Sequence, residues 1–115
     1  MVDDCLFCKM VAGTIPPDTV YEDDEILAFR DIHPQAPVHV LVIPKRHITT
    51  LNDVGDADTL LMGRLLLTAK RIAEESDIAD TGYRAVISCN RGGGQSVFHL
   101  HLHLLGGRRM KWPPG

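Results

Sequence analysis

The stretch "VFHLHLHLLGG", Val97 to Gly107, places histidines at every second position with leucines between them. Successive side chains of a β-strand point to opposite faces, so one face of this strand should carry His99, His101 and His103. The other face should carry Leu100, Leu102 and Leu104, which suit a hydrophobic core. The sequence therefore predicts a half-buried strand that directs three imidazoles toward one place.

The composition is that of a small globular protein. With 115 residues we expect a single domain over residues 1–115. Hydrophobic residues make up 44% of the chain, enough for a core without disulfides, and the odd count of three cysteines also argues against a disulfide framework. The net charge of −3 and a pI near 6.0 argue against a general nucleic-acid binder.

The N-terminus and the apolar segments of the sequence show whether it carries a targeting signal or a membrane span. The N-terminus lacks the basic, apolar and small-residue pattern of a signal peptide. No apolar run approaches the roughly 20 residues that a membrane span needs. We therefore expect a cytoplasmic protein that has no membrane partner.

The first half of the chain predicts one short helix and three strands. The helix should begin at Asp3 or Asp4, which can cap it, and end at Gly13. Thr19 to Asp31 predicts two strands around the tight turn "EDDE". The segment "VHVLVIP", Val38 to Pro44, is rich in β-branched residues and predicts the next strand.

The second half predicts one long helix, from Asp56 or Asp58 to about Glu75, and a strand over Tyr83 to Cys89. The helix has an apolar stripe at helical spacing: Leu61, Leu65, Ala69, Ile72 and Ala73. Further leucines widen this stripe: Leu60, Leu66 and Leu67. A wide stripe indicates burial on two sides, one of them against a partner subunit. One long helix with about five strands joined mainly by hairpins predicts an antiparallel α+β domain.

Facing histidines have two chemical uses. Neutral imidazoles can ligate a transition metal, or one imidazole can be a nucleophile that its neighbours orient. The glycine-rich loop before the histidine strand, Asn90 to Ser96, favours the nucleophile, because its N–H groups can converge on a phosphate. Neutral donors should add to this loop: Asn90, Gln95 and Ser96.

The segment "HLHLHLL", His99 to Leu105, resembles the signature of the histidine-triad (HIT) superfamily. Three further segments resemble its Hint branch, the histidine triad nucleotide-binding proteins: Ala28 to Ile48, Gly93 to Arg108 and the ending "WPPG". The resemblance implies the HIT-like fold, a five-stranded antiparallel sheet with one long and one short helix, which dimerises into one continuous sheet. His103 supports the Hint branch, since two other branches, the dinucleoside-polyphosphate hydrolases and the galactose-1-phosphate uridylyltransferases, carry glutamine at that position.

The resemblance also implies an activity. Hint proteins are purine nucleoside phosphoramidases, which cleave the P–N bond of adenosine 5′-phosphoramidates and release AMP and an amine without a cofactor. His101 would be the nucleophile and form a nucleotidyl-histidine. Its helpers would be His103, His39 and Ser96.

The resemblance carries binding roles onto further residues. The phosphate would contact Asn90, Gly94 and Ser96, and the ribose hydroxyls would contact Asp31. The purine would lie among apolar side chains: Leu6, Phe7, Met10, Phe29, Ile32 and Leu41. Trp112 would reach toward the partner's active site in a homodimer. No role is implied for His33.

The N-terminal "CLFC" places Cys5 and Cys8 three residues apart, so both side chains can face one way on a helix. A redox pair would normally follow a strand in a βαβ setting, which is not predicted here. Two unrelated buried cysteines and a structural zinc site both stay open. Bacterial histidine-triad proteins with such a site imply its other ligands, His47 and His99.

Two competing functions remain at this stage. The protein could be a nucleotide-sensing or scaffold protein whose hydrolysis is incidental, although a pure binder would not need His101 with its helpers. It could also be a zinc-dependent hydrolase that uses the triad as ligands. Against the latter, no Asp or Glu lies close in sequence to the triad as a base.

Overall fold

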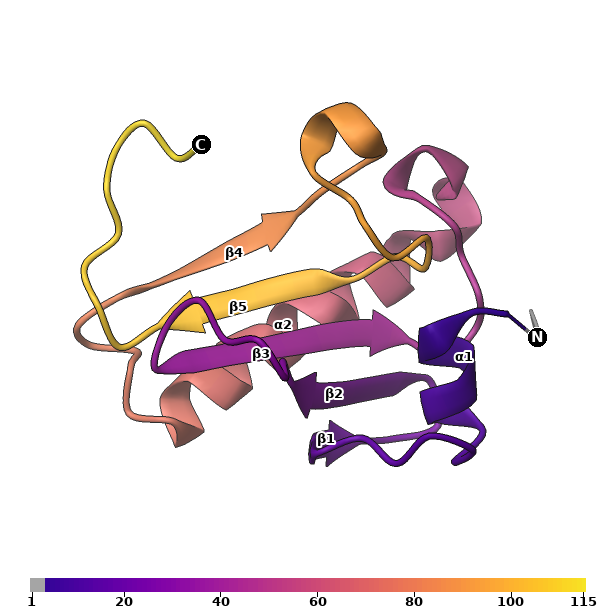
Figure 1. Cartoon of the computed structure of the whole chain (residues 1–115), viewed down its shortest axis with the longest axis horizontal. Coiled ribbons are helices and arrows are strands. Elements are labelled where there is room, and N and C mark those ends of the chain that lie inside the picture. Colours follow the sequence, from indigo (N-terminus) through magenta and orange to yellow (C-terminus); the bar gives the residue numbers. More distant parts are fainter. Residues whose placement is uncertain (1–3) are drawn as a thin grey trace.

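The computed structural model describes residues 4–115, so Asp3, one of the two expected helix caps, lies outside the described residues. One antiparallel sheet has the strand order β1-β2-β3-β5-β4 (Figure 1). Its strands are β1 (Thr19–Glu22), β2 (Ile26–Arg30), β3 (Val38–Pro44), β4 (Tyr83–Ile87) and β5 (Leu102–Gly106). The helices are α1 (Leu6–Val11) and α2 (Thr59–Glu75). The expected α+β fold, with one long and one short helix, is confirmed.

The alternation of side chains along the strands builds the main core between the sheet and α2. Every second residue of β2, β3 and β5 faces the helix, as Ala28, Val42 and Leu104 do. The predicted apolar stripe of α2 meets them: Leu61, Leu65, Ala69, Ile72 and Ala73 are all buried. Each such buried side chain contributes roughly 1.5–3 kcal/mol, so this layer accounts for much of the stability.

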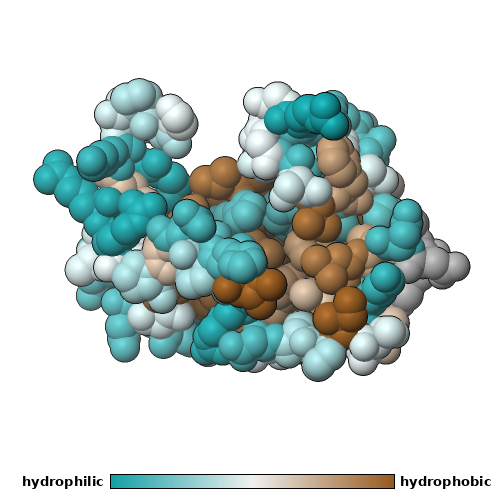
Figure 2. All heavy atoms as spheres, in the orientation of Figure 1, coloured by the Kyte–Doolittle hydropathy of each residue, from teal (hydrophilic) through white to brown (hydrophobic). Residues whose placement is uncertain are grey.

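On the opposite face of the sheet, α1 is the helix that packs against the strands within residues 4–115, and it covers one end (Figure 1). Phe7 and Cys8 of α1 pack there against Leu27, Phe29 and Leu41 of the sheet. Figure 2 shows hydrophobic side chains gathered on this face over β2 and β3 and beside α1. The uncovered part of the sheet is therefore the natural place for a ligand.

The histidine strand begins later than expected. Regular pairing of β5 with β3 starts at Leu102, opposite Val42, and residues 97–101 are irregular. Before Leu102 the main chain moves away from β3, and Leu100 donates its N–H to Ile48 instead, at 2.6 Å. The burial of Leu100, Leu102 and Leu104 in the main core is confirmed.

The cap of α1 differs from expectation, whereas α2 starts where it was predicted, with Asp58 as its N-cap residue. Helix α1 is capped by Cys5, whose Sγ accepts the N–H of Cys8 at 3.3 Å, whereas Asp4 lies exposed in the preceding turn. Helix α2 begins at Thr59, after a short 3₁₀ turn over Asp56–Asp58, and ends at Glu75 as predicted. The thiol displaces the expected carboxylate as cap because Cys5 already lies buried under the helix.

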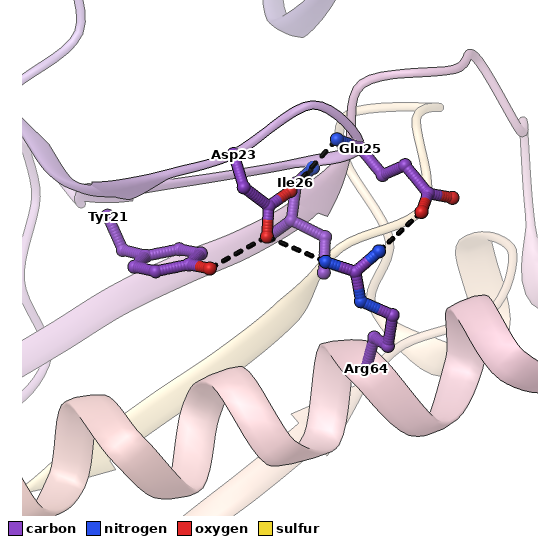
Figure 3. Close-up of polar contacts among 5 residues, drawn as sticks. All are labelled: Tyr21, Asp23, Glu25, Ile26 and Arg64. Carbon is purple, nitrogen blue, oxygen red and sulfur yellow. Dashed lines mark hydrogen bonds and ion pairs between the residues drawn. The ribbon is translucent and has the colours of Figure 1, made fainter.

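A polar network fastens the β1–β2 turn to α2 (Figure 3). Asp23 accepts hydrogen bonds from the Tyr21 hydroxyl at 2.7 Å and from the Glu25 and Ile26 amides, and it pairs with Arg64 at 2.8 Å. Burial alone would raise the pKa of Asp23, but these hydrogen bonds outweigh burial and lower it. The network thereby fixes the turn that leads into β2, the strand whose Leu27 and Phe29 lie on the open face.

The outer side of α2 and the edge strand β4 leave apolar surface in contact with solvent. Leu60, Leu66 and Leu67 are 76%, 53% and 65% exposed, and Tyr83 of β4 is 39% exposed. The sequence predicted burial of this helix on two sides, and within residues 4–115 these leucines are exposed, so burial against a partner subunit stays a prediction. Within residues 4–115, no helix has the length and apolar character to cross a membrane.

Candidate active site and metal cluster

His101 lies buried on the open face, just before β5, against the edge of the Phe7 ring at a centroid distance of 5.1 Å. Its Nδ1 lies 2.7 Å from the main-chain oxygen of His99. A carbonyl oxygen can only accept, so Nδ1 carries the hydrogen and Nε2 keeps a free lone pair. Burial lowers the pKa of His101, which favours this neutral form.

His39 and His103 form a second pair on the same face. The Gln35 N–H donates to Nδ1 of His39 at 3.0 Å, so neutral His39 carries its hydrogen on Nε2. That Nε2 lies 2.9 Å from Nδ1 of His103 and donates to it. His103 must then carry its own hydrogen on Nε2. Burial lowers the pKa of His103 to about 4 and also lowers the pKa of His39, so both rings are neutral at pH 7.

Asp31 follows β2 and brings a carboxylate beside this pair. Its Oδ2 lies 3.5 Å from Nε2 of His39, and its Oδ1 accepts the N–H of His33 at 2.8 Å. No Asp or Glu lies close to the triad in sequence, but Asp31 comes close in space, because β3 lies between β2 and β5 in the sheet.

One atom each of Asp31, His39 and His103 lies close enough to the others to share a metal ion. The hydrogen bonds argue against that use. A neutral His39 that accepts the Gln35 N–H at Nδ1 has a hydrogen, and no lone pair, on the Nε2 that faces the other two side chains. A metal-dependent hydrolase built on the triad is therefore disfavoured.

A separate cluster joins the two cysteines of the N-terminal segment to Nδ1 of two histidines: Cys5, Cys8, His47 and His99. The Nδ1 atoms lie 3.2 Å apart. Sulfur–nitrogen distances are 3.4 Å from Cys5 to His99, 3.3 Å from Cys8 to His47 and 3.6 Å from Cys8 to His99. The structure thus brings together the four residues that the sequence predicted as metal ligands.

The far nitrogens of these two imidazoles have partners of their own. Nε2 of His99 lies 2.7 Å from the main-chain oxygen of Pro44, and Nε2 of His47 lies 3.3 Å from the Thr49 hydroxyl. The carbonyl fixes the hydrogen of His99 on Nε2, and the hydroxyl can do the same for His47. Both Nδ1 lone pairs then face the thiols. Burial raises the pKa of the Cys5 thiol, a cost that a bound cation would offset.

The glycine-rich loop forms a 3₁₀ turn over Arg91–Gly93, followed by Gly94 at φ +90°, which favours glycine. Gln95, expected as a phosphate donor, is buried instead: its amide accepts the Asn90 N–H and donates to the carbonyls of Thr49 and Val97. That expectation is wrong. Asn90, Gly94 and Ser96 remain exposed on this loop.

The side chains expected around a purine differ in exposure. Phe7, Phe29 and Leu41 are buried in one cluster, with the Phe7 and Phe29 rings edge to face at 5.3 Å. Leu6 and Ile32 are 40% and 81% exposed, and Met10 is partly buried. The first set forms a wall of the open face, and the second set leaves apolar surface available beside it.

Trp112 lies in the tail after β5 and is 83% exposed. Among residues 4–115, no aromatic contact joins it to the histidines of its own chain. Residues of the same tail surround it on the surface: Arg109, Met110 and Lys111.

Main-chain groups decide the state of this site, and no sequence pattern points to them. The N–H of Gln35 and the carbonyl of Pro44 belong to residues whose side chains suggest no function. The prolines around Gln35 and the proline at the end of β3 were the only signals. They marked loops and strand ends without indicating which atom would meet an imidazole.

Comparison with known proteins identifies relatives. Residues 12–110 match the HIT domain. An uncharacterized HIT-like protein of Synechococcus elongatus is 53% identical over the full length of both chains. A purine nucleoside phosphoramidase of Escherichia coli is 49% identical over 108 residues, 94% of this chain and 91% of its own. A HIT family hydrolase from Legionella pneumophila has a similar structure, with a TM-score of 0.96 and 57% identity over 97% of this chain and 100% of its own.

The lowered histidine pKa values predict a pH dependence of stability. Between about pH 6.5, the ordinary histidine pKa, and about pH 4, the unfolded chain binds a proton that folded His103 refuses. The free energy of unfolding should therefore fall as the pH is lowered through this window, and His39, His99 and His101 act in the same direction. Urea unfolding at several pH values measures this slope.

The variant His103→Gln isolates one contribution, since glutamine has no titration in this range. Its unfolding free energy should decline less steeply than that of the wild type between pH 6.5 and 4. Equal slopes for the two proteins would show that His103 is not held neutral by the fold.

Proposed function

Because this chain belongs to the HIT domain family and has hydrolases among its relatives, we propose that it is a purine nucleoside phosphoramidase. It would cleave the P–N bond of adenosine 5′-phosphoramidates and release AMP and an amine. One observation carries this proposal: His101 is buried beside the open face, and its Nδ1–H donates a hydrogen bond to the His99 carbonyl at 2.7 Å. Its Nε2 lone pair is therefore available for attack on phosphorus.

The reaction has two steps. Nε2 of His101 forms a bond to the α-phosphorus while the P–N bond breaks, and the departing amine nitrogen keeps the electron pair and takes a proton. The His101 ring becomes positively charged in the nucleotidyl-histidine, and the His99 carbonyl on Nδ1 stabilises that charge. Water then attacks phosphorus and the His101 Nε2–P bond breaks, which releases AMP and restores the lone pair of His101. The proton that water loses replaces the one given to the departing amine.

The neighbouring groups have roles that follow from their hydrogen positions. His103 carries a hydrogen on Nε2, because Nδ1 accepts from His39, and can donate it to a phosphate oxygen. Ser96 is exposed on the glycine-rich loop, where its hydroxyl can give a proton to the leaving amine. Asn90 and Gly94 of the same loop would contact the phosphate.

The nucleoside would lie along the open face. Asp31 is half-buried at the end of β2, and its carboxylate can accept hydrogen bonds from the ribose hydroxyls. The wall formed by Phe7, Phe29 and Leu41, with exposed Leu6 and Ile32 and partly buried Met10 beside it, suits a flat purine. Such a pocket binds by burial and stacking, so both adenine and guanine should be accepted.

The test is intact-protein mass spectrometry and steady-state kinetics with an adenosine 5′-phosphoramidate. Wild-type protein should gain the mass of an AMP group, and His101→Ala should not. The kcat of His101→Ala should fall by several orders of magnitude while the affinity for AMP changes little, because the base wall and Asp31 remain. Ser96→Ala should cost less, roughly 10²–10⁴-fold.

Turnover by His101→Ala at a rate near that of the wild type would overturn this mechanism. A wild-type protein that binds AMP but neither forms the adduct nor turns over would support the nucleotide-sensing or scaffold alternative instead.

A structural zinc ion fits the second cluster. With Zn–N near 2.0–2.1 Å and Zn–S near 2.3 Å, a tetrahedron separates two nitrogens by about 3.3 Å and a nitrogen and a sulfur by about 3.6 Å. The observed distances, 3.2 Å between nitrogens and 3.3–3.6 Å between sulfur and nitrogen, agree within a few tenths of an ångström. Four protein ligands would close the site, so the ion would stabilise the fold and take no part in the reaction.

Metal analysis of protein purified without chelators should find one zinc per chain. The double variant Cys5→Ser with Cys8→Ser should lose it and unfold at lower urea concentration, because the ion would no longer join α1 to His47 and His99. Cys89→Ser is the matched control, since Cys89 lies outside the cluster, and it should keep the zinc. Full zinc content in the double variant would refute this assignment.

The outer face of α2 and the free edge of β4 fit a homodimer with a continuous sheet. Leu60, Leu66 and Leu67 expose an apolar surface that a partner can cover, and β4 is paired only with β5 on its inner side. Trp112, in the exposed tail beyond β5, would then be able to approach the partner's site.

Light scattering at micromolar concentration should give the mass of a dimer. Leu67→Glu places a charge within the proposed interface and should yield a monomer. Ile32→Glu alters an exposed apolar side chain that lies outside α2 and β4, and it should stay dimeric. A monomer mass for the wild type would defeat the proposal.

A further inference from the structure

The start of the C-terminal tail rests directly on the loop between β2 and β3. Gly107 has φ +87°, and a Cβ atom there would lie 2.9 Å from Cβ of Pro37, so only glycine permits this close approach. The next residue, Arg108, donates Nε–H to the main-chain oxygen of Gln35 at 3.0 Å. The tail therefore holds the loop both by packing and by a charged hydrogen bond.

Both main-chain polar groups of Gln35 are hydrogen-bonded. Its carbonyl oxygen accepts from Arg108, and its N–H donates to Nδ1 of His39 at 3.0 Å. The side chain of Gln35 is exposed and bonds only locally, to the His33 carbonyl. A displacement of Arg108 would therefore move the main chain of Gln35, and with it the N–H that contacts the ring of His39.

The state of His103 depends on that contact. While the Gln35 N–H occupies Nδ1 of His39, Nε2 of His39 donates to Nδ1 of His103. If the contact is lost, neutral His39 can carry its hydrogen on Nδ1 in part of the population. The Asp31 carboxylate, 3.5 Å from Nε2 of His39, still favours the original position but is too far for a short hydrogen bond. With the hydrogen on Nδ1, Nε2 of His39 would accept from Nδ1 of His103, and His103 would lose the hydrogen on the nitrogen that faces substrate.

We propose that Arg108 is a positioning residue: through Gln35 and His39 it keeps the Nε2 hydrogen of His103 available to the substrate phosphate. This rests on the proposed phosphoramidase function, in which His103 donates to a phosphate oxygen. Arg108 itself is exposed in the tail and touches none of the triad histidines in the hydrogen-bond network. The tail would thus have two roles: Arg108 fixes the hydrogen positions of His39 and His103, and Trp112 approaches the partner's site.

The experiment compares Arg108→Ala with Arg109→Ala, a matched control in the same tail. Among residues 4–115 the Arg109 side chain has no hydrogen-bond partner, and only its carbonyl is used, by Arg108. With an adenosine 5′-phosphoramidate, Arg108→Ala should lower kcat roughly 10-fold or more, below the 10²–10⁴-fold limit for losing the donor itself. Its KM should change little, and Arg109→Ala should match the wild type.

A second readout measures the imidazole hydrogens without any turnover. The ¹⁵N shifts of labelled histidines distinguish a nitrogen that carries hydrogen from one that does not. In wild-type protein His39 and His103 should both carry hydrogen on Nε2, and in Arg108→Ala part of the population should carry it on Nδ1. Arg108→Lys retains a donor for the Gln35 carbonyl and should restore both kcat and the shifts in part.

Several results would overturn the proposal. One is an unchanged kcat and unchanged ¹⁵N shifts in Arg108→Ala. Another is a loss of kcat in Arg108→Ala without any change of shifts, and with the same loss in Trp112→Ala, which would assign the effect to the tail's tryptophan. If wild-type protein shows no turnover, the proposed function fails, while the ¹⁵N comparison still decides whether Arg108 sets the state of His39 and His103.

Discussion

The site depends on which ring nitrogen of each histidine carries the hydrogen. In His39, His99, His101 and His103, one nitrogen contacts a group that fixes this position. The Pro44 carbonyl fixes His99, the His99 carbonyl fixes His101, and the Gln35 N–H fixes His39. His103 follows from His39. Nδ1 of His99 and Nε2 of His101 thereby keep a lone pair, and Nε2 of His103 carries a hydrogen, all in neutral rings. In the proposed function these three nitrogens are a metal ligand, a nucleophile and a donor. Burial lowers the pKa of all four histidines and so maintains these assignments at pH 7.

His99 connects the two clusters. Its side chain belongs to the cysteine–histidine cluster, and its carbonyl orients His101. Phe7, on the helix that Cys5 caps, lies against the rings of both His99 and His101. The N-terminal helix, the cysteine–histidine cluster and His101 therefore form one packed unit. If the cluster holds zinc and His101 is the nucleophile, as proposed, loss of Cys5 and Cys8 should disturb the reaction through position rather than chemistry.

The sheet allows this arrangement because its two faces have separate tasks. One face is buried under α2 and provides stability, so the other can carry the polar side chains of the site without loss of the main core. The Asp23–Arg64 network fixes the β1–β2 turn against α2 (Figure 3). At the other end of the sheet, the tail after β5 rests on the β2–β3 loop through Gly107 and Arg108. Both ends of β2 are thus supported from outside the site.

The sequence determined the fold class, the apolar stripe of α2 and the core leucines of the histidine strand, because periodicity is a local property. The four residues of the cysteine–histidine cluster were implied by the resemblance to histidine-triad proteins. Only the tertiary structure decided the rest. It placed Asp31 beside His39, took Gln95 out of the set of phosphate donors, made Cys5 rather than an aspartate the cap of α1, and delayed β5 until Leu102. It also chose the hydrogen position of each histidine. Those choices are made by main-chain groups brought together by long-range packing, and a main-chain N–H or carbonyl is the same at every non-proline residue, so the sequence carries no mark of which one meets an imidazole.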